Sequence, residues 1–362
     1  MQISDMVRRQ GGNSGFSRGH ESKLAIAMLH QQSLRSGEIR TPAPRRPSSR
    51  RSPAPWSLHY HKDAYGNFGD DLNPWLFARL LPDLIRPDAP SSLVGIGTIL
   101  NSTLPAGPKL IVGSGVGYGA APVMDDSMQV HFVRGPGTAA ALGVPPSMAI
   151  TDPAYMATQF LPPRGNGSGG TILLPHHVSA RTADWRHVAR RAGIRYVDPT
   201  ASALQVIDSI RNARLVITSA MHGAILADAF RVPWVRVAEY RHLNEFKWKD
   251  WGDSVGVAST SRALPALHDD SADGMWPSMM RRMRIWRRHG RPYRDVSVTS
   301  GAMRSSAVAV DEAVSTLRQL DHVSCGTLSS NAMMRGRMEQ LRDAFDRLSP
   351  ASRSWPQLKL VA

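Results

Sequence analysis

The stretch 214–235 constrains the fold of this chain most, because it combines a buried strand, a short loop and a helix. The apolar run at 215–217, Leu-Val-Ile, is short and largely β-branched, as in a central parallel strand. Small and apolar residues at 224–230 then predict a compact helix. The residues between them, 219–222 (Ser-Ala-Met-His), are therefore expected at the carboxyl end of a strand.

His222 is expected in the first turn of that helix. Open α/β sheets bind their ligands outside the carboxyl ends of the strands. Free N–H groups and the helix dipole favour an anion at the same place. Two interpretations of His222 remain open at this point: a histidine that binds or reacts with a ligand, and one that only caps or packs.

Length and composition set the broad class. The 362 residues, 42% of them hydrophobic, suffice for two domains that each have a core. The one cysteine, Cys325, excludes an internal disulfide and a cysteine-based metal cluster, and it predicts a cytosolic protein. We find no stretch of the ~20 apolar residues that would cross a bilayer, and no apolar core of a signal peptide at the N-terminus.

The net charge of +15 indicates a polyanionic partner. The candidate partners are nucleic acid, an anionic membrane surface and acidic substrates. Residues 1–55 are rich in arginine and contain several prolines near their end, which predicts a disordered basic tail. No series of aromatic residues alternates with those arginines, and no nucleic-acid-binding fold is recognisable. We therefore expect no nucleic-acid partner.

The folded part is expected to begin with a strand at 57–61 and a helix at 74–81, with Asn73 as N-cap and Pro74 in the first turn. The loop before this helix is longer and more polar than a first βα turn needs. An acid in this loop is suited to accept a proton or to bind a sugar hydroxyl, and the alternative is an Asx-turn with a capping acid. The polar candidates in this loop are Asn67, Asp70 and Asp71.

Further strands are predicted at 92–97, 109–112 and 129–133. The glycine-rich segment 113–119 lacks the dinucleotide-binding spacing, but its Ser114 and Gly115 lie where backbone N–H groups approach a phosphate or carboxylate. A tight strand exit is the alternative interpretation.

Arg134 follows the strand at 129–133, and a helix is predicted from Thr138 to a stop at Gly143. The guanidinium fork of an arginine suits a phosphate or a carboxylate. The alternatives for Arg134 are a surface residue and an ion-pair partner.

A second αβ series begins with a strand at 171–177, whose exit carries His176 and His177. A helix at 183–192, a short strand at 195–198 and a helix at 203–212 follow. Two such series separated by a Gly/Pro-rich linker predict an α/β protein with two Rossmann-like domains facing each other across a cleft. We expect at most one of the adjacent histidines to face the cleft, and the pair makes a poor metal site without further ligands.

The predicted organisation has four parts. Residues 1–55 form the tail, 56–162 the N-terminal domain, 163–252 the C-terminal domain, and 253–362 a basic and mainly helical region. A basic amphipathic helix is expected at 279–288, suited either to an anionic membrane surface or to packing on the domain, and a second helix is expected at 332–348.

Six motifs in this order resemble the polysaccharide pyruvyl transferase family, and they are nearest to the ketal-forming enzymes of succinoglycan-type exopolysaccharide synthesis. The motifs lie at 66–73, 113–119, 133–136, 151–154, 220–225 and 246–251. The resemblance implies a GT-B-like fold and the transfer of pyruvate from phosphoenolpyruvate to two hydroxyls of one sugar as a ketal. It implies an oligosaccharide or lipid-linked acceptor, no metal and no cofactor beyond the donor substrate. The protein is then expected in the cytoplasm, with peripheral contact at the anionic inner membrane face.

The resemblance also implies residue roles. His222 binds phosphoenolpyruvate or protonates it, and Asp70 takes the proton of the acceptor hydroxyl. Many family members carry an arginine two residues before the motif histidine, where this chain has Ala220. Another cation must then meet the phosphate, and Arg241 or Lys247 is expected to do so. The full donor set comprises Arg134, Ser219, His222, Gly223, Arg241, Lys247, Ser114 and Gly115, and the acceptor set comprises Asn67, Asp70, Asp71, His176 and His177.

Two other functions compete with this one. A glycosyltransferase that uses a nucleotide sugar would fit the same kind of fold, although no Asp-x-Asp lies beside a strand end. Ala220 favours a catalytically inactive glycan-binding homologue. A hydrolase is disfavoured, because the segment around Ser114 lacks the Gly-x-Ser-x-Gly spacing.

Overall fold

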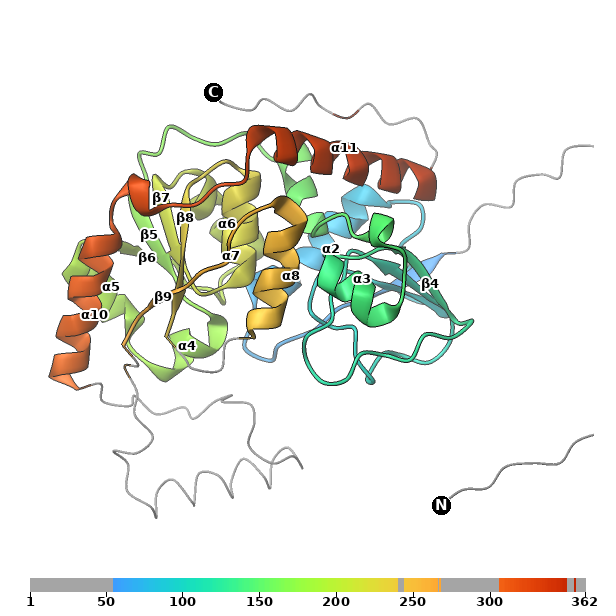
Figure 1. Cartoon of the computed structure of the whole chain (residues 1–362), viewed down its shortest axis with the longest axis horizontal. Coiled ribbons are helices and arrows are strands. Elements are labelled where there is room, and N and C mark those ends of the chain that lie inside the picture. The colour runs from blue at the N-terminus through green and yellow to red at the C-terminus, as the bar shows by residue number, and fades with distance from the viewer. Residues whose placement is uncertain (1–54, 240–243, 266, 268–305, 350–354, 356–362) are drawn as a thin grey trace, which may run out of the picture. The chain divides into compact units, whose positions relative to one another are not determined.

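Two parallel β-sheets organise the computed structural model, which describes residues 55–239, 244–265, 267, 306–349 and 355 (Figure 1). The N-terminal sheet has the strand order β1-β2-β3-β4, and the C-terminal sheet has the order β6-β5-β7-β8-β9. The strands are β1 (Trp56–His59), β2 (Ser91–Val94), β3 (Lys109–Val112), β4 (Met128–Phe132), β5 (Thr171–Leu174), β6 (Arg195–Tyr196), β7 (Leu215–Thr218), β8 (Trp234–Ala238) and β9 (Arg262–Ala263). Both sheets are Rossmann-like, which confirms the α/β prediction.

Helices connect and cover these strands (Figure 1). The α-helices are α2 (Phe68–Leu80), α3 (Pro136–Leu142), α4 (His177–Thr182), α5 (Trp185–Ala192), α6 (Ala203–Arg211), α7 (Met221–Ala229), α8 (Glu245–Val255), α10 (Ala307–Leu320) and α11 (Asn331–Leu348). The 3₁₀ helices are η1 (Pro146–Met148), η2 (Pro153–Gln159) and η4 (Val323–Cys325). No helix in the described parts is long and apolar enough to cross a membrane.

The order in which strands are added to the C-terminal sheet reverses between β5 and β7. The chain passes from β5 to β6 on one side and then crosses to β7 on the other side. In open α/β sheets such a switch point leaves a crevice at the carboxyl ends of the two strands. The loops that leave β5 and β7 carry His176 and Ser219, and the backbone N–H of His176 donates to Ser219 Oγ at 2.8 Å.

The strand, loop and helix predicted from 214–235 are present. All four residues of β7 are buried, and the strand pairs with β5 on one side and β8 on the other. His222 is the second residue of α7, as expected.

The start of α2 differs from its prediction. The helix begins at Phe68 with Asn67 as N-cap, so Pro74 lies inside it rather than in its first turn. Two acids in the first turn favour this earlier start, because they complement the helix dipole. Pro74 has no N–H for the carbonyl of Asp70, and the Asn73 side-chain amide donates to that carbonyl instead at 2.9 Å.

Two other boundaries also shift. α3 begins at Pro136 after Gly135, not at Thr138, although its end at Gly143 in the left-handed conformation is as predicted. The exit of β5 folds into the short helix α4, where we expected a loop.

A single hydrophobic cluster extends between the two sheets. It joins Phe132 of the N-terminal sheet to Leu174 and Val216 of the C-terminal sheet, through residues of α2, α6, α7 and η2. A separate cluster lies between the C-terminal sheet and helices α5 and α10.

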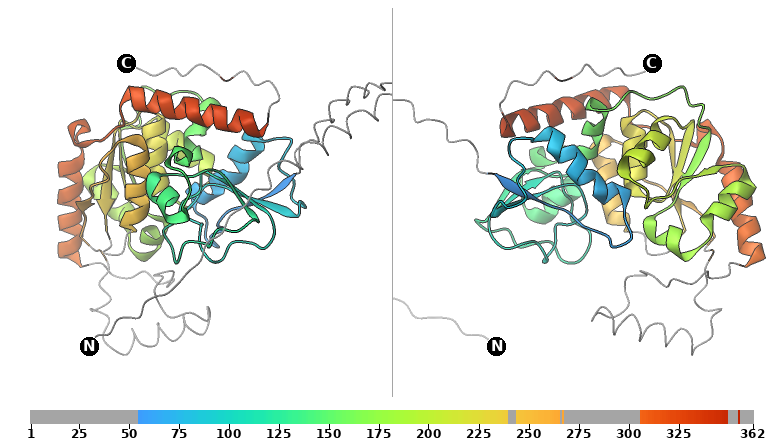
Figure 2. Two further views of the ribbon diagram at one scale, coloured as in Figure 1. Left: turned by 45° about the vertical axis from the view of Figure 1, so that its right-hand side comes forward. Right: turned by 180° about the vertical axis from the view of Figure 1, so that it is seen from behind.

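The C-terminal helix α11 joins the larger cluster. It packs against η2 and α8 (Figures 1 and 2). The His131 ring contacts the Ala344 carbonyl oxygen at 2.7 Å. Phe345 meets Phe77 and Phe132 edge to face. The helix predicted at 332–348 is confirmed, whereas the one predicted at 279–288 lies outside the described residues.

Asn73 offers a test of this packing. Its side chain is fully buried, accepts the Ile96 N–H at 2.7 Å and donates to the carbonyls of Ile96 and Asp70. Asn73→Ala leaves these backbone groups unpaired and should cost about 2–4 kcal/mol of unfolding free energy. Denaturant unfolding of this variant measures the loss, with Arg79→Ala on the exposed face of α2 as control. Equal stability of the two variants would contradict the stabilising role given to the buried hydrogen bonds of Asn73.

Candidate active site

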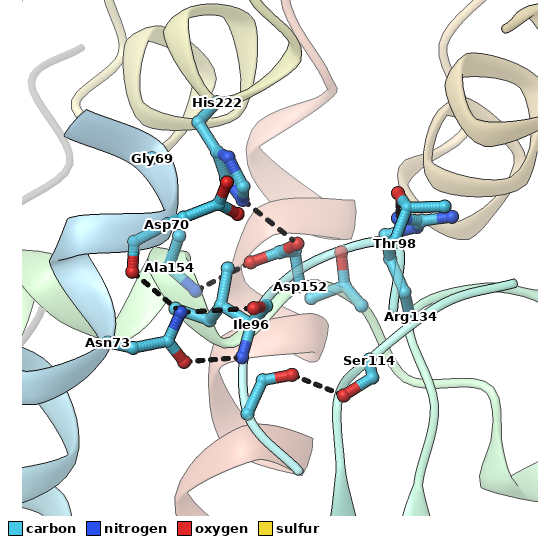
Figure 3. Close-up of polar contacts among 12 residues, drawn as sticks. Gly69, Asp70, Asn73, Ile96, Thr98, Ser114, Arg134, Asp152, Ala154 and His222 are labelled. Carbon is cyan, nitrogen blue, oxygen red and sulfur yellow. Dashed lines mark hydrogen bonds and ion pairs between the residues drawn. The ribbon is translucent and has the colours of Figure 1, made fainter. Parts of the chain in front are cut away.

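The candidate site gathers side chains from both halves of the described structure. His222 comes from α7, Gly69 and Asp70 from α2, and Asp152 from the segment before η2 (Figure 3). In the sequence, 152 residues separate Asp70 from His222. Figure 3 shows the Asp70 carboxylate beside the His222 ring, so the two predicted catalytic residues meet.

The His222 ring is confined on both sides. Only 8% of His222 is exposed, and its Nε2 lies 3.7 Å from Asp152 Oδ2. A Cβ atom on Gly69 would lie 2.2 Å from His222 Nδ1, so any side chain at position 69 would displace the ring. Gly223, which follows in α7, donates its N–H to the Ala220 carbonyl and lets the helix approach Thr218 of β7 closely.

The Asp70 carboxyl is also largely buried, with 8% of the residue exposed. Burial raises its pKa above the ordinary value, and the nearby His222, His61 and Lys247 oppose this rise. Asn67 Nδ2 donates to Asp70 Oδ2 at 2.6 Å, while the Asn67 side-chain oxygen caps α2. The first turn of α2 therefore fixes the position of this carboxyl group, while burial raises its affinity for a proton.

Asp71 makes a local contact in the same turn. Its Oδ2 accepts the N–H of Asn67 at 3.2 Å, so the Asp71 carboxylate stabilises the start of α2. The structure thus gives Asp71 the capping contact that the sequence left as an alternative.

Lys247 lies near the same charged groups. Its residue is 7% exposed, and Nζ donates to the hydroxyl of Tyr118 at 2.9 Å. The Lys247 charge acts on the pKa values of Asp70, His176 and His177, which places these groups around one region. Arg241, the other cation that we expected, lies outside the described residues.

Arg134 is enclosed. None of it is exposed, and its Nε and Nη2 lie 3.1 and 3.0 Å from Asp250 Oδ2. Nη1 donates to Thr98 Oγ1, and Nη2 donates to the Val116 carbonyl. A Cβ atom on Gly115 would lie 2.2 Å from the guanidinium carbon, so Gly115 provides the space in which the group lies. The structure therefore shows Arg134 in the ion pair that the sequence left as an alternative.

Asp250 was given no role from the sequence, although it lies in one of the six motifs. Its carboxylate accepts the N–H and the hydroxyl of Thr138 at 2.8 and 2.7 Å, in addition to the Arg134 guanidinium. Asp250 thus caps the first turn of α3 from α8. An acid within the aromatic motif 246–251 was the available signal, but its partner lies 116 residues away.

Ser114 is buried where β3 ends. Its hydroxyl donates to the Val94 carbonyl at 2.9 Å and also contacts the Gly95 carbonyl. The backbone N–H of Gly115 donates to the Gly97 carbonyl oxygen. These contacts join the carboxyl ends of β2 and β3.

A further buried carboxyl lies at the switch point of the C-terminal sheet. Glu239 follows β8 and is 3% exposed, and its Oε1 accepts the Ser219 hydroxyl at 2.5 Å. Burial raises the pKa of Glu239 to about 7, although hydrogen bonds from Ser219 and Ser179 oppose the shift. Nothing in the sequence except its position after a strand indicated Glu239.

The adjacent histidines are held near each other, with ring centroids 4.2 Å apart. Burial, with smaller effects from Lys247 and other neighbours, lowers the pKa of His176 well below its ordinary value. Burial also lowers the pKa of His177 to about 4, and its Nε2 lies 3.3 Å from Asp63 Oδ2. Both rings are therefore neutral at pH 7. Among the described residues, no group of three or more His, Cys, Asp or Glu side chains is arranged to hold a metal ion.

Glu239 predicts a pH-dependent stability. Its raised pKa favours the folded protein when the carboxyl is protonated, so this contribution is complete below about pH 4.5 and is lost as the pH rises through about 7. Glu239→Gln removes the ionisation and should gain stability relative to the parent, on the order of 3 kcal/mol between pH 5 and pH 8. Unfolding measured across this pH range tests it, with Glu312→Gln on the surface of α10 as control. A stability difference that does not change with pH would contradict the buried carboxyl.

Comparison with known proteins places this geometry in context. Residues 64–240 match the family described as polysaccharide pyruvyl transferase, and this range contains α2, the Asp152 segment and α7. The chain is also similar to the succinoglycan biosynthesis protein ExoV of Rhizobium meliloti (strain 1021). The two are 42% identical over 214 residues, which cover 57% of this chain and 67% of that protein. The chain therefore belongs to the polysaccharide pyruvyl transferase family of enzymes.

Proposed function

We propose that this enzyme transfers pyruvate from phosphoenolpyruvate to one sugar of an exopolysaccharide repeat unit, which is carried on a lipid. One sugar hydroxyl adds to the enol carbon as the methylene carbon takes up a proton, and the second hydroxyl then displaces inorganic phosphate from the same carbon. The cyclic ketal therefore forms without a further reactant. The meeting of Asp70 and His222 carries the proposal, because one site then holds a buried carboxyl and an imidazole at a helix N-terminus. The name of the 42% identical relative supports an exopolysaccharide as the acceptor class.

The donor is proposed to bind at the start of α7. The free amides of the first turn meet the phosphate or carboxylate of phosphoenolpyruvate beside the His222 ring, and Lys247 supplies the cation that Ala220 does not. Ser219 and Gly223 shape this turn, since both already have hydrogen-bond partners within the protein. We propose that Arg134, Ser114 and Gly115 hold the neighbouring loops in place for the donor.

Asp70 is proposed to accept the proton of the attacking sugar hydroxyl. Its raised pKa brings proton affinity closer to what a general base needs near neutral pH. Asn67 and Asp71 hold the Asp70 turn, and we place His176 and His177 on the acceptor side. Because both rings are neutral, they can form hydrogen bonds with sugar hydroxyls without repelling the Lys247 ammonium group.

We further propose a GT-B-like arrangement with domains at 56–162 and 163–252. The two parallel Rossmann-like sheets support it, as does the return of α11 to Phe77 and Phe132 of the N-terminal half. Residues 253–362 then contribute helices to both domains. From the net charge of +15 we propose that the enzyme acts in the cytoplasm, at an anionic membrane face.

Activity is tested with phosphoenolpyruvate and total lipid-linked oligosaccharide from the source organism. The protein should release phosphate while the glycan gains one pyruvate less one water, and His222→Ala should lower the rate by at least about a hundredfold. Phosphate assay and glycan mass spectrometry measure the two products. Background phosphate release together with turnover of a nucleotide sugar would replace this function with glycosyl transfer.

Lys247 provides a test of the donor site. Lys247→Ala should raise the KM for phosphoenolpyruvate roughly tenfold or more, because a cation facing the anionic donor is lost. Lys249→Ala is the matched control, since Lys249 lies on the same helix with an exposed side chain paired to Asp253. Equal KM values for the two variants would remove Lys247 from the donor site.

A further inference from the structure

Two buried polar atoms face each other beside the candidate site without a hydrogen bond. Asp152 Oδ2 and His222 Nε2 are each shielded from solvent, and neither has a hydrogen-bond partner among the described residues. They lie 3.7 Å apart, so a movement of about 0.8 Å would bring them to the usual length of a charge-assisted hydrogen bond. Figure 3 shows this contact as the link between the ring and the Asp152 segment.

The Asp152 carboxylate has a fixed orientation. No part of Asp152 is exposed, and its Oδ1 accepts the Ala154 N–H at 2.9 Å as the N-cap of η2. With Oδ1 committed to the helix, Oδ2 is left for the imidazole. η2 itself packs against α7, the helix that carries His222.

The His222 ring is equally constrained from the other side. The backbone of Gly69 lies against Nδ1, where a Cβ atom would approach to 2.2 Å. In the part of the chain that the structure describes, the charged groups that face the ring are Asp152, from the segment before η2, and Asp70, from α2. The His222 ring is thus held between the backbone of α2 and the Asp152 carboxylate, whose orientation is fixed by its contact with the Ala154 N–H.

We propose that Asp152 is the positioning residue of His222: it accepts the Nε2–H, sets the tautomer of the ring and holds it at the N-terminus of α7. A carboxylate beside Nε2 favours the tautomer that carries its proton on Nε2. The catalytic role of this Asp152–His222 dyad rests on the proposed function, whereas the tautomer of the His222 ring does not depend on that function.

Asp152→Asn separates this role from helix capping. The Ala154 N–H needs an acceptor, so the amide oxygen must remain on it and the NH₂ group must face His222 Nε2. Nε2 then has to accept, and the neutral ring must carry its proton on Nδ1. Asp152→Ser is a second variant that keeps a good N-cap and has no group long enough to reach the ring.

Nitrogen NMR of histidine-labelled protein reads the tautomer directly, with the His222 signal assigned by its loss in His222→Gln. The parent should show Nε2–H, Asp152→Asn should show Nδ1–H, and Asp152→Ser should show a mixture. The kcat/KM for phosphoenolpyruvate should fall at least about tenfold in both variants. Thr151→Val is the control, because it removes the neighbouring contact with Ser254 without touching His222.

The outcomes are distinct. An unchanged tautomer in Asp152→Asn would overturn the dyad, even if activity fell. If the tautomer switches in Asp152→Asn but the parent enzyme does not turn over phosphoenolpyruvate, the role of Asp152 is supported and the proposed function is overturned.

Discussion

The buried ion pair between Arg134 and Asp250 determines how α8 lies on the N-terminal half. Both side chains are fully enclosed, so the loss of either would leave an uncompensated charge in the interior. Asp250 also caps α3 through Thr138, which makes the pair part of a hydrogen-bonded network. Lys247 lies one turn earlier on α8, and its contact with Tyr118 of the glycine-rich segment depends on this placement.

The second constraint is the shared hydrophobic cluster that joins the two sheets. It packs α2 against α6, and η2 against α7, and so brings Asp70 and Asp152 to His222. Neither carboxylate reaches the ring through local sequence. The site therefore depends on the packing of the halves, and Gly69 is the position at which this packing tolerates no side chain.

Local signals explain which elements could be predicted. The run at 215–217 and the helix with His222 in its first turn follow from apolar periodicity, which tertiary contacts reinforce. The start of α2 was misjudged because Asn73 and Pro74 are themselves a good start signal. The contacts of Asn73 with Ile96, 23 residues away, are invisible in a sequence. The same holds for the Asp250 partner of Arg134 and for the burial of Glu239, since both depend on distant segments.

A crystal structure of the protein with phosphoenolpyruvate tests the central claim most directly, which is that the first turn of α7 receives the donor. We predict an anionic group of phosphoenolpyruvate within hydrogen-bond distance of the α7 amides, beside the His222 ring, with Lys247 Nζ turned from Tyr118 toward it. Phosphoenolpyruvate bound away from α7, for example in the groove between α5 and α10 lined by Arg191 and Arg318, would contradict the account.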